Sequence, residues 1–175
     1  MAMPTMGDPR FERTVIYVCV HSAEGAMGLV INKALETVTF PELLVQLGID
    51  VEHPDERIVI HAGGPVEPSR GFVLHSADYV QDSTLIVGET VALTATLDIL
   101  TAIARNEGPR KSLLALGYAG WGAGQLDREI QDNGWLHIEA DDELLFTTGP
   151  EVKWPMAMAK LGIDISLLSA EAGHA

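Results

Sequence analysis

Six histidines are the residues of this chain that could most readily bind a metal ion. They are His21, His53, His61, His75, His137 and His174. No two of them form the H-E-x-x-H pair of zinc enzymes, and no carboxylate is spaced to complete a three-ligand set. His61 and His75 are expected near strand ends, where they could meet His21, but a hydrogen bond to the backbone is the more common role. We therefore predict no metal and no cofactor.

The single cysteine could act as a nucleophile if a base stood beside it. Cys19 and His21 are two positions apart, and such residues share one face of a β-strand. A cysteine between two valines is, however, more often an inert core residue. One cysteine also excludes an intramolecular disulfide and a cysteine-based zinc cluster. No G-x-S-x-G elbow is present, which argues against an α/β-hydrolase.

A glycine-rich stretch in the last third of the chain could bind an anion. It reads LALGYAGWGAGQLDREI over residues 114–130. We predict a strand at 112–116, a glycine turn and a helix from residue 123, an arrangement whose helix N-terminus attracts negative charge. The glycine spacing is neither that of a Walker A loop nor that of a dinucleotide-binding fingerprint. A tight turn, with Tyr118 and Trp121 packed between sheet and helix, is therefore the favoured interpretation.

Polar residues near the N-terminus carry the positive charge that an anion site at this turn would need. If residues 13–20 and 26–33 pair as a hairpin, the start of the first strand lies beside the end of the second. A small anionic-ligand pocket would then combine two cations with the turn. Its members would be Arg13, Lys33, Gly120, Gly122, Gly124 and Gln125. The more ordinary interpretation is a hydrogen-bonded scaffold, in which Asp8 and Asn32 help to fix the N-terminal turn.

The elements that would position these residues follow from hydrophobic periodicity and turn residues. Strands are predicted at 13–20, 26–33, 57–61, 71–76, 84–87, 112–116, 135–138 and 144–146. Helices are predicted at 40–47 after an N-cap at Thr39, at 96–105 with a buried stripe of Leu97, Leu100 and Ile103, from 123 to a stop at Asn133-Gly134, and at 152–161 with Trp154, Met158 and Leu161 inside. We expect the first strand to be covered on both faces and the tail at 170–175 to fray. The order of these elements lacks regular βαβ alternation, so it predicts a mixed sheet flanked by helices.

Composition limits the class of protein. The 175 residues fit one domain spanning 1–175, and 47% hydrophobic residues with 21% charged residues indicate a globular chain. No apolar run approaches the roughly 18 residues needed to span a bilayer, and no basic and apolar signal-peptide pattern opens the chain. A cytoplasmic location is therefore expected. The formal net charge of −14 disfavours direct DNA or RNA binding, which needs a clustered basic patch.

Several segments together resemble the YqgE/AlgH family of bacterial proteins. They are MPTMGDPRFERTVIYVCVH, GAMGLVINK, GGPVEPSRGFVLHS, LGYAGWGAGQLDREI with NGWL, and the ending AGHA. The resemblance implies a single α/β (α+β) unit with a bifurcated, barrel-like sheet dressed with helices. It brings no established biochemical activity and no catalytic or cofactor residues. One member has an effect on alginate production, from which the family's label of transcriptional regulator comes. Members usually carry an apolar lead-in before Ala2-Met3-Pro4 that is missing here, so a shorter N-terminal strand is expected.

Three functions remain open from the sequence. The preferred one is a non-enzymatic cytoplasmic binding or regulatory protein that acts through contacts with an unknown protein partner, with an indirect effect on gene expression. The second is a small anionic-ligand binding protein, or an enzyme, with its site at the turn of residues 120–124. The third, direct nucleic-acid binding, is disfavoured by the charge. The chain is expected to be a monomer or a homodimer and not to associate with a membrane.

Overall fold

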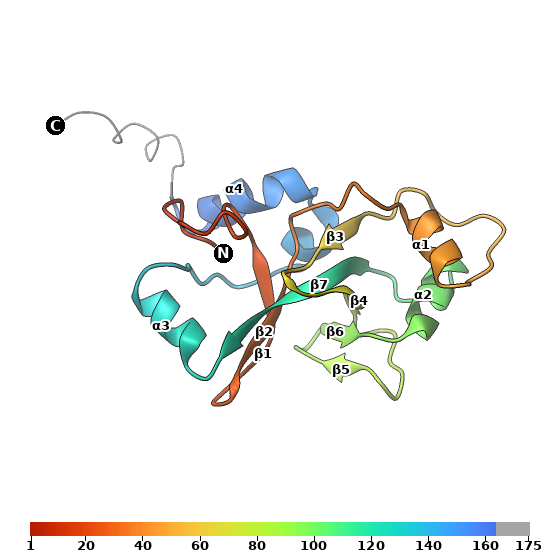
Figure 1. Cartoon of the computed structure of the whole chain (residues 1–175), viewed down its shortest axis with the longest axis horizontal. Coiled ribbons are helices and arrows are strands. Elements are labelled where there is room, and N and C mark those ends of the chain that lie inside the picture. The colour runs from red at the N-terminus through yellow and green to blue at the C-terminus, as the bar shows by residue number, and fades with distance from the viewer. Residues whose placement is uncertain (164–175) are drawn as a thin grey trace.

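The sheet is built around its central strand β7 (Figure 1). The computed structural model describes residues 1–163, so the predicted frayed tail and His174 lie outside it. The elements are β1 (Ile16–Ser22), β2 (Gly25–Val30), α1 (Phe40–Gln46), β3 (Ile60–Ala62), β4 (Val66–Ser76), β5 (Leu85–Ile86), β6 (Val91–Thr94), α2 (Leu97–Ala104), β7 (Ser112–Gly122), α3 (Gln125–Gln131), a π-helix η1 (Glu143–Thr147) and α4 (Pro150–Lys160). The strand order is β1-β2-β7-β4-β6-β5, with β3 also paired to β7.

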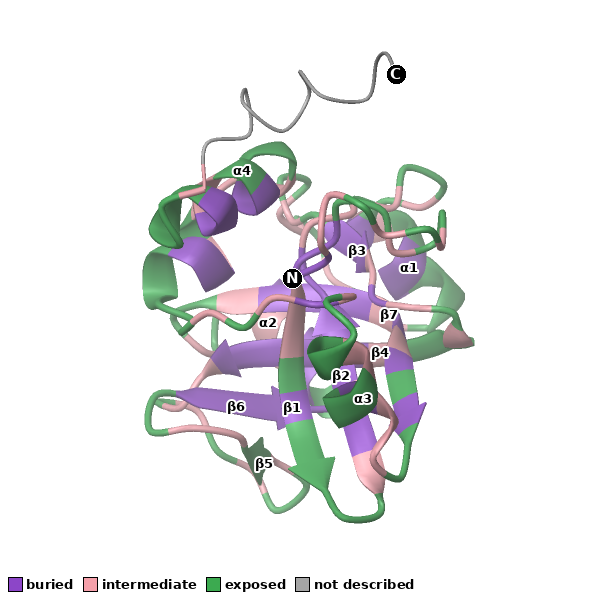
Figure 2. Ribbon diagram, turned by 90° about the vertical axis from the view of Figure 1, so that its left-hand side faces the viewer, coloured by how far each residue is buried: buried purple, intermediate pink, exposed green. Residues whose placement is uncertain are grey.

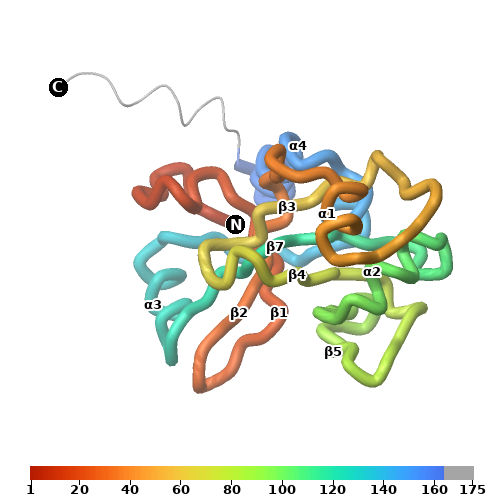
Figure 3. Tube along the Cα trace, turned by 45° about the vertical axis from the view of Figure 1, so that its right-hand side comes forward, coloured from red at the N-terminus to blue at the C-terminus, as the bar shows by residue number. Residues whose placement is uncertain are grey.

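The sheet is mixed and bifurcated, as predicted. One edge of β7 pairs with the parallel strand β3 at Leu114 to Leu116 and then with the antiparallel strand β2 at Ala119 to Gly122. Strand β4 runs antiparallel along the other edge. The sheet curls into a half-barrel with the β1–β2 hairpin at one end and β5 at the other (Figure 3). The predicted α/β class with a barrel-like sheet and flanking helices is thus confirmed.

Glycines allow the sheet to divide at the middle of β7. Gly117 has a φ of +73°, and a Cβ placed on it would lie 2.4 Å from the carbonyl oxygen of Gly64. A Cβ on Gly64 would in turn lie 2.1 Å from the carbonyl carbon of Tyr118. Only residues without side chains permit two backbones to cross this closely. Beside the crossing, Val30 N–H donates to the carbonyl of Gly63 at 2.8 Å, which joins β2 to the segment after β3.

Helices cover the two faces of the sheet with separate cores. On one face α1 and α2 bury Phe40 and Ile99 against Val73 and Leu114. On the other face η1 and α4 cover a larger core, which includes Leu74. The helix α3 and the N-terminal residues form a third, smaller cluster at the far end of β7. No helix within residues 1–163 is long and apolar enough to cross a bilayer.

Up to the end of α2, the structure follows most of the local sequence signals. The Thr39 cap of α1 is confirmed, since Thr39 and Glu42 form a reciprocal capping box. The predicted stripe of α2 is wrong in part: Leu97 is 52% exposed, and the buried face carries Ile99, Leu100 and Ala104 instead. The first strand is not covered on both faces, since most residues of the edge strand β1 are exposed (Figure 2). The short strand β6 was not predicted.

The C-terminal third departs most from the predictions. The expected strand at 135–138 is only an isolated bridge between Ala2 and Trp135. The expected strand at 144–146 is the π-helix η1, whose Leu144 and Leu145 are buried beneath α4. The glycines after residue 116 do not form a turn at once, because β7 continues to Gly122 by pairing with β2. In α4 Trp154 and Met158 are buried as predicted, while the residue at 161 is exposed.

Candidate functional site

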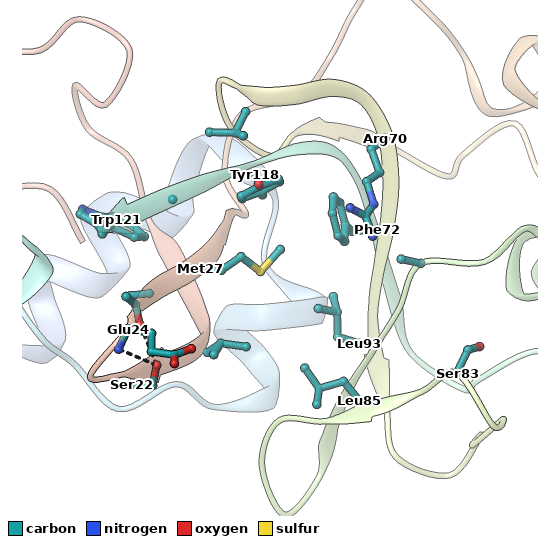
Figure 4. A pocket seen from close by; sticks show the side chains of 16 residues that line it. Ser22, Glu24, Met27, Arg70, Phe72, Ser83, Leu85, Leu93, Tyr118 and Trp121 are labelled. Atoms are coloured by element: carbon teal, nitrogen blue, oxygen red, sulfur yellow. Dashed lines mark hydrogen bonds between the residues drawn. The ribbon is translucent and has the colours of Figure 1, made fainter. Parts of the chain in front are cut away.

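A groove of about 750 Å³ occupies the concave side of the half-barrel, between the β1–β2 hairpin and the β5–β6 hairpin (Figure 4). Its walls are mainly apolar, with Met27 from β2, Phe72 from β4, and Leu85 and Leu93 from the β5–β6 hairpin. Phe72 and Leu93 also belong to the core beneath η1 and α4. The groove is therefore the part of this apolar face that those two helices leave uncovered. Its volume lies within the range of about 300–1,000 Å³ that ligand sites usually have.

The polar groups of the groove lie at its rim. The guanidinium of Arg70 lies 5.1 Å from the centre of the Phe72 ring and donates to Glu67 at 3.2 Å. Across the groove, the Ser22 hydroxyl accepts from the backbone N–H of Glu24 at 3.2 Å (Figure 4). No hydrogen bond joins the titratable side chains that line the groove within the described residues. Such a lining can hold an apolar segment, but it offers no paired acid and base.

A second cleft, of about 410 Å³, lies at the end of β7 between the N-terminal loop and α3, which are close together in Figure 3. Gly120 and Trp121 line both this cleft and the groove, so the two hollows adjoin. The charged residues of the cleft are three carboxylates and one guanidinium. They are Asp8, Glu129, Asp132 and Arg10. The carboxylate of Asp8 is paired with Arg10 at 2.7 Å, which leaves an excess of negative charge.

The carboxylate of Glu129 accepts hydrogen bonds from three other side chains that line this cleft. One of its oxygens accepts from the indole N–H of Trp121 at 3.0 Å and of Trp135 at 2.7 Å, while the other accepts from the Gln125 amide at 2.7 Å. Burial raises the pKa of the Glu129 carboxyl, but the three donated hydrogen bonds outweigh it and the net pKa is lowered. No salt bridge reaches Glu129 within residues 1–163. Because its pKa is lowered, the Glu129 carboxyl is ionised at neutral pH even without a salt bridge.

The structure brings together some of the residues suggested for an anion site. Gly120 and Gln125 line the second cleft, and Gln125 accepts from the backbone N–H of Gly122 at 3.0 Å. Gly124 is the N-cap of α3 with a φ of +64°. The other four members of the suggested pocket, Arg13, Lys33, Gly122 and Gly124, do not line this cleft.

Arg13 and Lys33 instead serve the N-terminal scaffold. The guanidinium of Arg13 lies 5.6 Å from the Trp154 ring. The ammonium of Lys33 donates to the carbonyl of Arg10 at 2.8 Å. Asn32 accepts from the N–H of Val15 at 2.7 Å and donates to the Arg13 carbonyl at 2.9 Å. These bonds match the hydrogen-bonded scaffold that the sequence also suggested.

The histidines are held separately. The ring of His61 shares a hydrogen bond of 3.1 Å with the Leu114 carbonyl. The ring of His75 contacts the Ser76 carbonyl and, at 2.9 Å, the Thr94 hydroxyl. Burial lowers the pKa of both rings, which favours neutral imidazoles. The exposed His21 instead contacts Asp127 of α3 at 3.2 Å. The described chain holds no group of three side chains that could bind a metal.

Cys19 and His21 do not cooperate. A register shift at Cys19 interrupts the alternation of β1, so the two side chains do not share a face. The thiol is buried in the main core, and burial raises its pKa to about 12. A thiolate is therefore scarce at neutral pH, and Cys19 is a core residue.

The burial of one lysine was not predicted from the sequence. Lys153 of α4 is 2% exposed, and its ammonium donates to the carbonyls of Leu144 and Leu145 at 2.6 Å each. Burial lowers its pKa to about 8. It satisfies carbonyls that η1 leaves without partners, which is a structural role. Its position beside Trp154 on a buried helix face was the only available signal.

Known proteins resemble the chain over its whole length. The AlgH-like family model matches residues 1–166. A UPF0301 protein of Rhodospirillum rubrum is 56% identical over 175 residues, covering 100% of this chain and 91% of that protein. A UPF0301 protein of a Bradyrhizobium strain is 55% identical over 183 residues, covering 100% of this chain and 85% of that one.

Two solved structures resemble the fold. The solution structure of the AlgH protein from Pseudomonas aeruginosa is 48% identical with a TM-score of 0.81, covering 100% of this chain and 93% of that one. A crystal structure of a Corynebacterium diphtheriae protein has a TM-score of 0.72 and 22% identity, covering 91% of this chain and 83% of that one, and supports the fold alone. The chain therefore belongs to the AlgH-like family, the YqgE/AlgH family that its sequence motifs indicated.

Proposed function

We propose that this chain is a non-enzymatic cytoplasmic protein that acts by binding a protein partner, with an apolar segment of the partner lying in the groove. The observation that carries the proposal is the apolar lining of the groove, which continues the main core into solvent. Contiguous exposed apolar surface of this kind usually marks an interaction site. Any effect on gene expression is then indirect, through the partner.

The edges of the sheet support a protein partner. β1 and β5 end the strand order, and no further strand of residues 1–163 pairs with their outer edges. Val20 is 41% exposed on β1, and Leu85 and Ile86 are 46% and 54% exposed on β5. Unpaired edges with apolar side chains favour contact with another chain. The proposal leaves the chain itself as a monomer or a homodimer.

The cations of the chain support a partner other than nucleic acid. Six of the eleven Lys and Arg side chains form salt bridges with carboxylates. They are Arg10, Arg57, Arg70, Arg110, Lys111 and Lys160. Lys153 is buried, and the Lys33 ammonium is bonded to a backbone carbonyl. Few Lys or Arg side chains are therefore left to bind the phosphate groups of a nucleic acid.

Photo-crosslinking in cells tests the proposal. A benzoylphenylalanine replaces Leu85 in the groove, and a matched variant carries it in place of Val45, which is 77% exposed on α1. We expect one discrete crosslinked protein from position 85 and none from position 45. The crosslinked protein from position 85 should disappear when Met27→Asp is added. Equal crosslinking from both positions, or no crosslinking from position 85, would contradict the proposal that a partner binds in the groove. Turnover of a substrate that a point mutant abolishes would contradict the non-enzymatic part.

A small-molecule site at residues 120–124 is the second candidate function. It is supported by the second cleft, which Gly120 and Gln125 line. The carboxylates of that cleft favour a cationic ligand over an anionic one, and Arg13 and Lys33 lie elsewhere. A thermal-shift screen with amines and with phosphate at fixed salt tests it, because a ligand that binds the folded state alone raises the melting temperature. A flat screen would argue against this candidate.

A further inference from the structure

The last part of β7 has a strand on one edge only. β2 pairs with Ala119 to Gly122, whereas β4 pairs with β7 only as far as Tyr118. Opposite β2, no strand of residues 1–163 pairs with this part of β7. An unpaired strand edge presents backbone donors and acceptors to which another extended chain can add.

A side chain of the protein itself occupies part of this edge. The Gln125 amide oxygen accepts from the backbone N–H of Gly122 at 3.0 Å. That oxygen takes the place that the carbonyl of a neighbouring strand would have. Gly120, which is exposed, adds no side chain over the edge. The edge is thus accessible from the second cleft, which Gly120 and Gln125 line.

The chemistry of the cleft indicates the charge of what adds there. Met6, Phe11 and Pro65 give it an apolar side. Glu129 and Asp132, which also line it, lie three apart at the end of α3, so their side chains are neighbours. Neither of these two carboxylates forms a salt bridge within the described chain. Because the guanidinium of Arg10 is paired with Asp8, the cleft keeps two carboxylates that have no cation within salt-bridge distance, and a cation entering it would be attracted.

We propose that this cleft binds an extended segment of a protein partner, which adds to the open edge of β7 and places a Lys or Arg side chain beside Glu129 and Asp132. The backbone of β7 supplies binding that does not depend on sequence, and the carboxylates select a basic side chain. This binding of a segment in the second cleft is separate from the proposed binding of a partner segment in the groove. Neither Asp132 nor Glu107, the two residues replaced in the test, lines the groove. Either proposal can therefore fail alone.

A peptide display library of random ten-residue sequences provides the probe. It is panned on the wild-type chain, and the enriched peptides are synthesised for fluorescence anisotropy. Asp132→Lys is the test variant, because Asp132 is exposed and a Lys suits the end of a helix. Glu107→Lys is the matched control, since it makes the same charge change on an exposed residue away from the cleft. We expect Lys- or Arg-bearing peptides, an affinity at least tenfold lower for Asp132→Lys, and less than a twofold change for Glu107→Lys.

Two further readouts separate strand addition from simple charge attraction. N-methylation of alternate peptide nitrogens removes the donors that an added strand needs, so one of the two methylated forms should bind at least tenfold more weakly. Amide NMR shifts should move at Gly120 and Gly122 and remain unchanged at Leu93 of the groove wall. An empty selection, enrichment without basic residues, equal binding of both methylated forms, or shifts confined to the groove would each overturn the proposal.

Discussion

Glu129 offers a quantitative test of how the second cleft is held together. Replacing it by Ala removes the acceptor of two indole N–H groups, on Trp121 and Trp135, which are only 8% and 6% exposed. A buried donor left without a partner costs about 1–3 kcal/mol, so the two together cost about 2–6 kcal/mol. Because the cleft is wide enough to admit water, the lower half of that range applies. We expect Glu129→Ala to reduce the free energy of unfolding by about 2–4 kcal/mol.

Glu129→Gln provides the graded comparison. The amide keeps one oxygen for the indoles, but its NH2 group then faces the NH2 group of Gln125. We expect a loss of about 1 kcal/mol, since one hydrogen bond is replaced by a donor–donor contact. Urea unfolding followed by tryptophan fluorescence measures both variants, with Glu107→Ala as an exposed control. A loss below about 0.5 kcal/mol for Glu129→Ala would refute the reasoning.

The pH dependence of Glu129 gives a second check. The folded pKa lies below the usual value of 4.5, so the ionised carboxylate stabilises the folded state at pH values above the unfolded pKa. This contribution is lost as the pH falls through the folded pKa. The stability difference between the wild-type chain and Glu129→Gln should therefore be constant near neutral pH and shrink in acid. A difference that grows in acid would contradict the assignment.

Three further outcomes follow from buried or constrained groups. The pKa of Lys153 is lowered from 10.5 to about 8, so between pH 8 and pH 10.5 the unfolded chain retains a proton that the folded chain releases. The free energy of unfolding should therefore rise by about 3 kcal/mol over this pH interval. Urea titrations should show that Lys153→Met lacks this rise. Cys19 should react with a thiol reagent only on unfolding, which absorbance follows, because its pKa is raised to about 12. Gly117→Ala should cost about 3 kcal/mol, from its positive φ and the contact with Gly64, whereas Gly122→Ala, whose Cβ would meet nothing nearer than 3.8 Å, should change stability by less than about 0.5 kcal/mol in the same assay.

Local signals in the sequence predicted those parts of the fold that local interactions determine. The Thr39 cap and the β1–β2 hairpin are examples, since each depends on residues close in the chain. Leu144 and Leu145 belong to an apolar run too short to distinguish a strand from a helix. The π-helix that they form depends on a lysine eight or nine residues later. Tertiary contacts therefore decided that segment.

The candidate sites depend even more on distant contacts. The glycines at 120 and 122 indicate a turn when the sequence is considered alone, yet they extend a strand because β2 pairs beside them. The groove combines Met27, Phe72 and Leu93 from three strands that no spacing pattern connects. The negative charge of the second cleft could not be predicted either, because its carboxylates come from two distant segments, the N-terminal loop and α3. The sequence could indicate Gly120 and Gln125, but not the charge around them.

The position of β7 in the chain has a consequence for how the protein is made. In the described sheet, β7 alone joins the β1–β2 hairpin to the β4–β6–β5 ladder, and it spans Ser112–Gly122. While the ribosome is still synthesising the first hundred residues, each half can form only as a separate small sheet with unpaired edges. The halves can unite only after residue 122 has emerged, because pairings so distant in sequence close late. A nascent chain stalled before β7 therefore exposes aggregation-prone strands, and these are the strands that a chaperone would need to protect.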